Sequence, residues 1–182
     1  MPIPTISLLQ VQAKWAYSEI DDGTLSHNYD NGPNVEELRA KHRSGVPFNK
    51  LTPDEQYNLA FLCVAHRPNL MIFMTGVDGL VEGRLDRTHI GALLVPEMVS
   101  GTPGFMSFEG FMNTTAESPK DARNVLPPAQ GYQVSSDPLT VGHYFGRPTL
   151  LDGYHRAASF WKFAPGDAVI RAYLPSLFVS AA

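Results

Sequence analysis

The sequence predicts an α+β fold, in which a small mixed sheet with packed helices carries a long loop-rich insertion. Three observations support this prediction. Residues 51–68 have the pattern of a capped helix, and residues 144–163 pass from an apolar strand through Asp-Gly into a helix. Residues 100–138 hold five Pro and four Gly among 39 positions. The chain has 182 residues, of which 43% are hydrophobic, so we expect one domain over 1–182 with the insertion around 44–136.

The first elements along the chain are expected to be a strand and a short helix. Residues 3–10 carry enough apolar and β-branched residues for a strand. Residues 35–42 (VEELRAKH) have the pattern of an amphipathic helix, with Asn34 placed to cap it and Gly45 just beyond its end. The Gly- and Asp-rich stretch 21–34 between them predicts a loop.

The next helix has the clearest local signals. Thr52 and Glu55 have the spacing of a capping box, and Pro53 occupies the first helical position, where its missing N–H costs nothing. Residues 57–64 are apolar on nearly all sides, which predicts a mostly buried helix. Pro68 predicts the end of the helix.

Short strands are expected after this helix, at residues 70–77 and 90–95. The loop-rich segment 100–138 follows, and within it residues 104–112 (GFMSFEGFM) are typical of an edge strand or a hairpin. A segment of this length without a helical period is either a functional lid or an ordinary surface excursion.

The pattern becomes regular again toward the carboxyl end. The expected elements are two strands, a helix and a last strand, at residues 139–141, 144–151, 153–163 and 169–174. In the helix, four residues spaced i, i+3, i+4 and i+7 form the expected buried stripe: Tyr154, Ala157, Ala158 and Trp161. This strand–turn–helix is the most consistent local pattern in the chain.

Composition argues against several classes of function. The net charge is −4, from 14 Lys and Arg against 18 Asp and Glu, and the basic residues are scattered, which argues against a nucleic-acid-binding protein. The apolar runs are too short to span a membrane, and the amino end lacks the pattern of a secretory signal, so we expect a cytoplasmic protein. A single cysteine, Cys63, excludes an intramolecular disulfide, and we interpret Cys63 and His66 as a core thiol and a helix-end histidine.

The segment Asp152-Gly153-Tyr154-His155-Arg156 carries the best candidate chemistry. His155 and Arg156 fall outside the buried stripe, in the first helical turn, where unpaired backbone N–H groups and the helix dipole attract anions. Arg156 supplies a bidentate cation and His155 a ring donor, while Gly153 allows a ligand to approach the backbone. Asp152 either caps the helix or holds magnesium bound with a nucleotide. The alternative is a structural turn, with Asp152 as N-cap and an Arg–Asp surface pair.

The segment LLDGYHRAASFWK resembles the DG-x-HR signature of the ParB/sulfiredoxin-like superfamily. The flanking sequences PLTVGHYFGRPT and AVIRAYL are similar to the strands expected on either side of that helix, so the resemblance covers residues 137–175. Residues 3–9 and 35–42 are similar to the opening strand and helix of that superfamily. The resemblance implies a ParB/sulfiredoxin-like fold, in which Gly153, Tyr154, His155 and Arg156 bind the phosphates of ATP or another nucleoside triphosphate with Mg²⁺.

The sequence also departs from known members of that superfamily. Sulfiredoxins carry Cys where this chain has Tyr154, so sulfinic-acid reduction is not expected. Chromosome-partitioning members continue into a helix-turn-helix domain, and the net charge of −4 further argues against centromere binding. Free-serine kinases of the superfamily have DGHHR and a separate catalytic carboxylate; here Tyr154 replaces the first His.

We therefore expect a protein that binds a nucleotide or a phosphorylated small molecule, as a small-molecule phosphotransferase or a nucleotide hydrolase. His155 would assist catalysis beside Arg156, and Glu109 is the candidate general base, with Glu97 and Asp78 as the next choices. The alternatives are a non-catalytic nucleotide-binding regulatory module and a nuclease-like DNA-processing protein, which would need a basic groove. By strand alternation, His143 could face the same pocket. The sequence indicates no oligomeric state.

Overall fold

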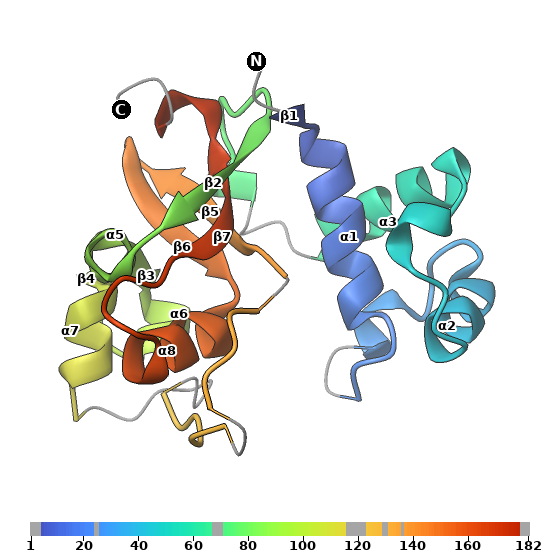
Figure 1. The fold of residues 1–182 in the computed structure, drawn as a ribbon. Coiled ribbons are helices and arrows are strands. Elements are labelled where there is room, and N and C mark those ends of the chain that lie inside the picture. The colour runs from blue at the N-terminus through green and yellow to red at the C-terminus, as the bar shows by residue number, and fades with distance from the viewer. Residues whose placement is uncertain are drawn as a thin grey trace. The chain divides into compact units, whose positions relative to one another are not determined.

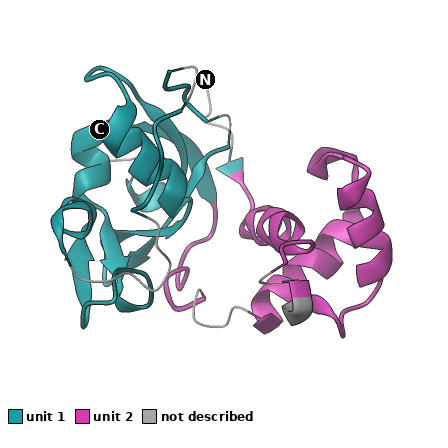
Figure 2. Cartoon of the chain, turned by 90° about the horizontal axis from the view of Figure 1, so that it is seen from below, with its two compact units in different colours: residues 1–5, 80–182 teal, residues 6–79 magenta. Residues whose placement is uncertain are grey.

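The computed structural model describes residues 5–23, 26–66, 71–115, 123–128, 131–135 and 137–178. The chain divides into two compact units, shown in different colours in Figure 2: unit 1 comprises residues 1–5 and 80–182, and unit 2 comprises residues 6–79. The chain passes between the units after residue 5 and again after residue 79, and the second boundary falls within the range 44–136, where the sequence predicts an insertion. The organisation as one domain stays a prediction.

Among its described residues, unit 2 contains the α-helices α1 (Leu8–Glu19), α2 (Val35–Arg43) and α3 (Pro53–His66) and the short 3₁₀ helices η1 (Ser26–Tyr29) and η2 (Phe48–Lys50) (Figure 1). Helices α1 and α3 pack along each other. The apolar core between the helices includes Ala13, Ala16, Ile20, Leu38, Leu59 and Leu62. Burial of this surface is the main stabilising contribution to the unit.

The strand predicted at residues 3–10 is wrong for most of its described part. Only β1 (Thr5–Ile6) is extended, and α1 begins at Leu8. The Oγ of Ser7 accepts a hydrogen bond from the Gln10 N–H at 3.2 Å, and Gln10 Oε1 accepts one from the Ser7 N–H at 3.3 Å. This reciprocal capping box starts a helix where β-branched residues favour a strand.

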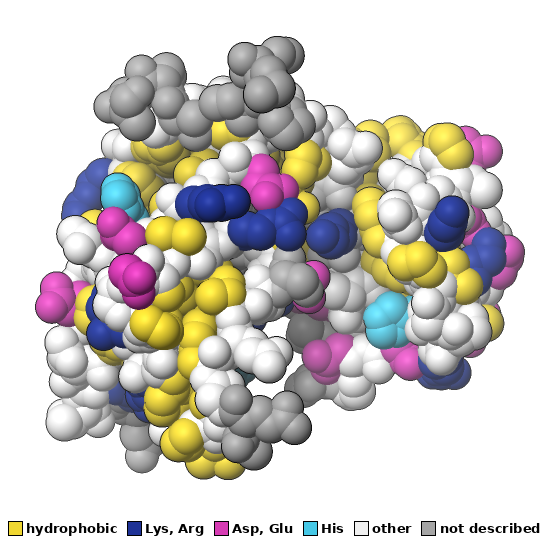
Figure 3. Space-filling model, viewed as in Figure 1, with side chains coloured by type: hydrophobic (Ala, Val, Ile, Leu, Met, Phe, Trp, Pro, Cys, Tyr) yellow, Lys and Arg dark blue, Asp and Glu magenta, His cyan; other side chains and the backbone are white. Residues whose placement is uncertain are grey.

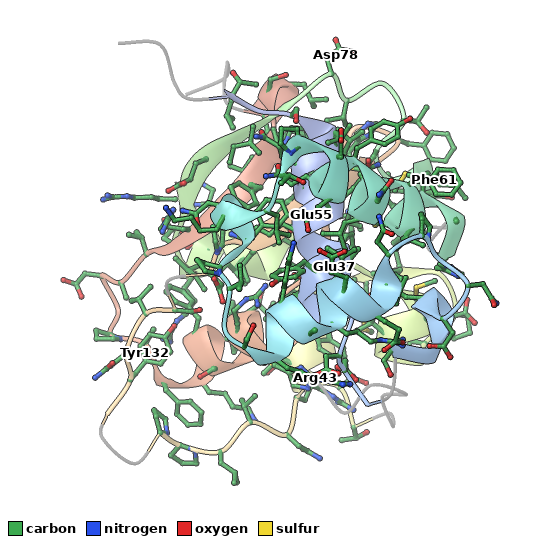
Figure 4. All side chains as sticks on the ribbon, turned by 90° about the vertical axis from the view of Figure 1, so that its right-hand side faces the viewer. Glu37, Arg43, Glu55, Phe61, Asp78 and Tyr132 are labelled. Carbon is green, nitrogen blue, oxygen red and sulfur yellow. The ribbon has the colours of Figure 1, made fainter. Side chains whose placement is uncertain are left out.

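Both helices that the sequence predicts in unit 2 are confirmed. Asn34 precedes α2 in a left-handed conformation (φ 57°), although its side chain makes no capping hydrogen bond. Glu55 N–H donates to Thr52 Oγ1 at 3.3 Å and Thr52 N–H donates to Glu55 Oε2 at 2.8 Å, which is the expected capping box of α3. The prediction that α3 is mostly buried is wrong. The helix packs on α1, but Tyr57 is 61% exposed and Phe61, labelled in Figure 4, is 60% exposed.

Lys41 of α2 links that helix to the start of α3. Its ammonium group forms ion pairs with Glu37 Oε1 at 3.1 Å and with Glu55 Oε1. Figure 4 labels the two carboxylates, one on α2 and one on α3. The hydrogen bond from Lys41, followed by that from the Thr52 backbone, lowers the pKa of Glu55. The ion pairs of Lys41 therefore join α2 to the first turn of α3.

Unit 1 is built on a seven-stranded mixed sheet with the order β1-β2-β7-β5-β6-β3-β4 (Figure 1). The strands after β1 are β2 (Leu80–Leu85), β3 (Leu94–Pro96), β4 (Phe105–Ser107), β5 (Leu139–Tyr144), β6 (Arg147–Asp152) and β7 (Ile170–Pro175). Strand pairs β2–β7, β5–β6 and β3–β4 are antiparallel, whereas β5–β7 and β3–β6 are parallel. The mixed sheet with several helices confirms the α+β class.

The helices of unit 1 are α5 (Arg87–Ala92), α6 (Glu97–Ser100), α7 (Phe108–Asn113) and α8 (Tyr154–Phe163), with a 3₁₀ helix η3 (Ser176–Phe178) after β7. Helices α5, α7 and α8 contribute buried side chains to one core together with the sheet, among them Ile90, Phe108, Phe111, Leu139, Leu150 and Phe160. This core supports the turn between β6 and α8.

Three further predicted strands, at residues 70–77, 90–95 and 104–112, need correction. Leu70 lies outside the described residues, and 71–77 contains a helical turn followed by turns. At 90–95, α5 continues to Ala92 because the Asp86 carboxylate accepts the His89 N–H at 2.8 Å and caps the helix, so only β3 remains extended. At 104–112, β4 is an edge strand, as predicted, but α7 follows it at once.

The strand predicted at residues 144–151 is divided by a turn. Phe145 and Gly146 both have positive φ, 47° and 76°, and connect β5 to β6 as a two-residue hairpin in which Tyr144 pairs with Arg147. The helix predicted at 153–163 and the strand predicted at 169–174 are confirmed as α8 and β7 within one residue at each end.

Candidate functional site

The turn from β6 into α8 consists of one residue, Gly153, between Asp152 and Tyr154. Gly153 has φ 90°, a left-handed conformation that favours glycine. A Cβ at this position would lie 2.6 Å from Leu139 Cδ2 and 2.9 Å from Arg156 Nη2. The backbone conformation therefore favours glycine, and any other residue would also make the ends of the Leu139 and Arg156 side chains shift.

The start of α8 has no side-chain cap. Asp152 is the last residue of β6 and Gly153 takes the N-cap position, so the alternative in which Asp152 caps the helix is wrong. Ala157 N–H donates to Gly153 O at 2.8 Å, which is the first intrahelical bond. The N–H groups of the three preceding residues have no acceptor within the helix, and such groups attract anions.

Arg156 folds back from the first turn of α8 over Gly153. Its Nη2 donates to Asp152 Oδ2 at 2.9 Å and to the Pro138 carbonyl at 3.3 Å, while its Nε is buried without a hydrogen-bond partner among the described residues. The side chains of Arg156 and Asp152 are 30% and 36% exposed. The ion pair between Arg156 and Asp152, which the interpretation as a structural turn predicts, is therefore present. The Asp152 carboxylate lies at the surface rather than in the core.

Tyr154 and His155 have opposite environments. The Tyr154 hydroxyl donates to the Leu150 carbonyl, and burial, followed by the negative charge of Asp152, raises the pKa of this phenol. Only the backbone N–H of Tyr154 is thus placed to meet a ligand. His155 is exposed and makes no side-chain hydrogen bond or ion pair with the residues that the structure describes, so its ring is accessible.

The buried stripe predicted for α8 is confirmed. Tyr154, Ala157 and Ala158 belong to the core of unit 1, and Trp161 packs against it. The Trp161 ring also approaches Gly91 of α5, where an added Cβ would lie 3.0 Å from it. The stripe anchors α8 and fixes the direction in which its amino end points.

Glu109, the predicted general base, is exposed in the first turn of α7. Its Cβ lies 3.6 Å from the position that a Cβ on Gly91 would take, on the side of α5 that faces Trp161. Trp161 is seven residues along α8 from Tyr154, which corresponds to about 10 Å of helix. Glu109 therefore lies near the second half of α8, and its catalytic role stays a prediction.

The next choices for the base occupy different places. Leu94 of β3 pairs with Thr149 of the parallel strand β6, and Glu97 is the first residue of α6, directly after the end of β3. Glu97 is exposed, and its Oε2 accepts the Gly104 N–H at 3.2 Å. Asp78 is exposed in unit 2, before β2 (Figure 4).

His143 is far along the hairpin from the turn. It pairs with Pro148, whereas Thr140, three residues earlier on β5, pairs with Asp152. Its Nδ1 accepts the Gly146 N–H at 3.3 Å, at the hairpin end of the strands. The suggestion that His143 faces the same pocket is therefore wrong, because the register places it at the other end of β6.

The donor set at the turn bears on the expected magnesium ion. Among the described residues, no group of three or more His, Cys, Asp or Glu side chains is placed to hold a metal ion. Asp152 offers one partly exposed carboxylate, and Mg²⁺ is commonly held by one or two carboxylates together with the phosphates of its nucleotide. The role of Asp152 in holding magnesium therefore stays a prediction.

Cys63 belongs to unit 2. It is 1% exposed in the apolar core between α1 and α3, and His66 packs its ring on Tyr29, with centroids 5.5 Å apart. The structure places both as the sequence predicts, as a buried thiol and a histidine at the end of a helix.

The comparisons with known proteins found no significant match to any family model, curated protein or solved structure. Across the part of the chain that the structure describes, no helix combines the length and apolar character needed to cross a membrane. Figure 3 shows Lys and Arg side chains lying among acidic and apolar ones on one face of the molecule.

Sequence reasoning missed two residues that contact the turn between β6 and α8. Pro138 supplies a carbonyl acceptor to Arg156, and Leu139 fills the space beside Gly153. Pro138 directly precedes β5 and Leu139 is its first residue. They reach the turn only because β5 pairs with β6. No local sequence signal indicates such a contact between strands.

Proposed function

We propose that the turn from Asp152 to Arg156 binds the phosphate group of a nucleotide or of another phosphorylated small molecule. The observation that supports this most is the uncapped start of α8 directly after a turn of one glycine. The guanidinium of Arg156 and the exposed ring of His155 come from the same helical turn as the available N–H groups. The resemblance of residues 137–175 to the ParB/sulfiredoxin-like superfamily supports the same ligand class.

Arg156 should contribute most to affinity. The dipole of an exposed helix end contributes about 0.3–1 kcal/mol to anion binding, whereas a hydrogen bond to a charged group contributes about 1.5–3 kcal/mol. Without ligand, Asp152 is the ionic partner of Arg156. A phosphate must compete with this carboxylate, and Mg²⁺ bound with a nucleotide would neutralise both anions.

Catalytic turnover of the bound ligand is a separate proposal from binding. Phosphoryl transfer or nucleotide hydrolysis requires a general base within hydrogen-bond reach of the acceptor. Glu109 remains the predicted base, and Glu97, which follows the end of β3, remains a next choice. In the described part of the chain, Asp152 is the one carboxylate bonded to Arg156, and that bond already engages it. A site whose carboxylate is engaged in this way favours the alternative, a regulatory module that binds a nucleotide without turning it over.

Calorimetric titration of the purified chain with ATP, other nucleoside triphosphates and inorganic phosphate, with and without Mg²⁺, tests the proposal. Arg156→Ala should weaken binding about tenfold or more, in keeping with the loss of a charged hydrogen bond. Arg156→Lys should restore part of the affinity, because the charge is kept and the two-pronged geometry is lost. His155→Gln should weaken binding less, since a donor remains. Arg147→Ala, at an exposed arginine at the start of β6, is the control and should bind like the parent.

Two results decide between the interpretations. If Arg156→Ala binds phosphate ligands as tightly as the parent but unfolds at a lower temperature, Arg156 only braces Asp152 and Pro138, and the proposal is wrong. Phosphate release from a bound nucleotide supports an enzyme, whereas tight binding without release supports the regulatory module.

A further inference from the structure

Two arginines of unit 1 lie directly opposite each other on neighbouring strands. The register of β2 with β7 pairs Arg84 with Arg171, and both residues are exposed. Their chain neighbours Leu85 and Ile170 are buried in the core of unit 1, so the two arginines project from the opposite face of the sheet. Like charges in directly opposite positions destabilise a sheet, and a nearby anion would relieve this repulsion.

One of these arginines is bonded to a carboxylate and the other is not. Glu82 accepts hydrogen bonds from Arg171 Nε at 2.5 Å and from Arg171 Nη2 at 2.7 Å. The described residues offer Arg84 no ion pair and no side-chain hydrogen bond. The guanidinium of Arg84 is therefore available to an anionic group from a ligand.

The strand register connects this pair to the turn between β6 and α8. The parallel register of β7 with β5 pairs Ala172 with Leu139. The residues just before these two, Arg171 and Pro138, therefore lie beside each other, and the Pro138 carbonyl accepts the bond from the first turn of α8. Neighbouring strands lie about 4.8 Å apart, so the two strand spacings from Arg84 to Pro138 amount to roughly 10 Å.

The carboxylate at the turn projects from the same face of the sheet as the two arginines. Thr140 pairs with both Tyr173 and Asp152, and paired residues share a face. Tyr173 is two residues from Arg171 and therefore projects from the same face as that arginine. Arg156 is bonded to Asp152 Oδ2, so its guanidinium reaches this face as well. We call these three residues, from β2, β7 and α8, the arginine row: Arg84, Arg171 and Arg156.

The carboxylates along the arginine row bear on the shape of a ligand. Asp152 and Glu82 are each bonded to an arginine of the row. Asp137 is exposed directly before Pro138, and its negative charge acts on Arg171, in the middle of the row. An anionic group of a ligand would be repelled there. Two anionic groups joined by a neutral linker therefore fit the row better than a continuous chain of phosphates.

We propose that Arg84, beside Arg171, is a second anionic subsite of the phosphate site. The ligand would be a small molecule with a phosphate at one end and a second phosphate or a carboxylate roughly 10 Å away. Arg156 would bind the first group and Arg84 the second, since a guanidinium matches either anion in a bidentate geometry. Because this subsite extends the phosphate site, it rests on the proposed function.

Titration calorimetry of the full chain with hexane-1,6-diyl bisphosphate and hexyl phosphate tests this inference. The two probes share a phosphate and a six-carbon chain and differ in the second anionic group. The bisphosphate should bind about tenfold or more tightly than hexyl phosphate, as expected for one added charged hydrogen bond. Arg84→Gln should remove most of this advantage and leave hexyl phosphate binding unchanged. The matched control is Arg147→Gln, at an exposed arginine at the start of β6, which should bind both probes like the parent.

Two further measurements locate the linker and exclude a folding defect. Tripolyphosphate, a continuous chain of phosphates, should bind more weakly than the bisphosphate. Asp137→Asn should strengthen tripolyphosphate binding more than bisphosphate binding, because it removes the carboxylate that a continuous chain meets. Arg84→Gln should unfold at a temperature equal to or above that of the parent, since the repulsion from Arg171 is relieved.

Failure of the subsite can be distinguished from failure of the phosphate site. If hexyl phosphate binding depends on Arg156 but the bisphosphate has no advantage, or keeps it in Arg84→Gln, the subsite is wrong and the phosphate site stands. If Arg156→Ala changes the binding of neither probe, the phosphate site is wrong and the subsite fails with it. Tripolyphosphate binding more tightly than the bisphosphate would overturn the class of ligand.

Discussion

Replacement of Gly153 by Ala tests the geometry on which the proposed phosphate site depends. The added methyl group would enter a left-handed backbone conformation and would meet the Leu139 side chain at 2.6 Å and Arg156 Nη2 at 2.9 Å. The turn would then have to shift away from β5, or the guanidinium would have to leave its position over the turn. The variant is expected both to unfold more easily and to bind phosphate ligands more weakly.

The size of the effect on stability has two sources. A non-glycine residue in the left-handed region costs roughly 1–2 kcal/mol. Inserting a methyl group into a filled space costs roughly 1–3 kcal/mol more, because neighbouring side chains must move. We therefore expect Gly153→Ala to lower the free energy of unfolding by about 2–5 kcal/mol.

Gly146→Ala is the matched control. Gly146 also has a left-handed conformation (φ 76°), but nothing lies within 4 Å of the Cβ that alanine would add there. Urea unfolding of both variants, followed by circular dichroism and tryptophan fluorescence, separates the conformational cost from the cost of the clash. Gly146→Ala should show only the conformational part, about 1–2 kcal/mol.

The comparison of the two glycine variants can refute the reasoning. If Gly153→Ala loses no more stability than Gly146→Ala, the close approach of Leu139 and Arg156 does not exist in solution. If Gly153→Ala loses stability but binds phosphate as the parent does, the turn is not the phosphate site.

Two further predictions concern unit 2. Because Lys41 lowers the pKa of Glu55, the ion pair contributes stability above the ordinary glutamate pKa, and this contribution is lost as the pH falls through the lowered value. Lys41→Met should therefore unfold more easily than the parent at neutral pH. Urea titrations at a series of pH values should show this difference in stability shrinking in acid, whereas a constant difference would contradict the assignment. Cys63 is 1% exposed, so a thiol reagent should label it only after unfolding, and Cys63→Ser should keep any ligand binding of the parent; rapid labelling of the folded chain would show that the thiol is accessible.

Elements with local signals could be predicted from the sequence. The Thr52–Glu55 capping box and Pro53 indicate where α3 begins, and the structure confirms the prediction. The same kind of signal is present at Ser7 and Gln10, where β-branched residues led us to expect a strand instead. The burial of α3 was not predictable in the same way, because a helix that is apolar on all sides does not show which side faces its neighbour.

The candidate site was predictable in its backbone and not in its contacts. The order of an apolar strand, Asp-Gly and an amphipathic stripe indicates β6, the turn and α8, since each depends on neighbouring residues. The bond from Arg156 to the Pro138 carbonyl depends on the pairing of β5 with β6, and the place of Glu97 depends on the parallel pairing of β3 with β6. Contacts between strands distant in sequence follow from tertiary structure and leave no local pattern.

The position of β7 has a consequence for the order in which the chain folds during synthesis. The last strand of the sheet in the sequence lies between β2 and β5, and it pairs Leu85 with Ile170 across most of unit 1. A ribosome must therefore have released residues 170–175 before β2 can pair with β7, whereas the helices of unit 2 depend on contacts within residues 6–79. Unit 2 can fold while unit 1 is still being translated, and during that interval β2 is without β7. Translation pauses before Ile170 would therefore lengthen the time for which the backbone of β2 and its buried residues Leu80, Val81 and Leu85 are open to aggregation.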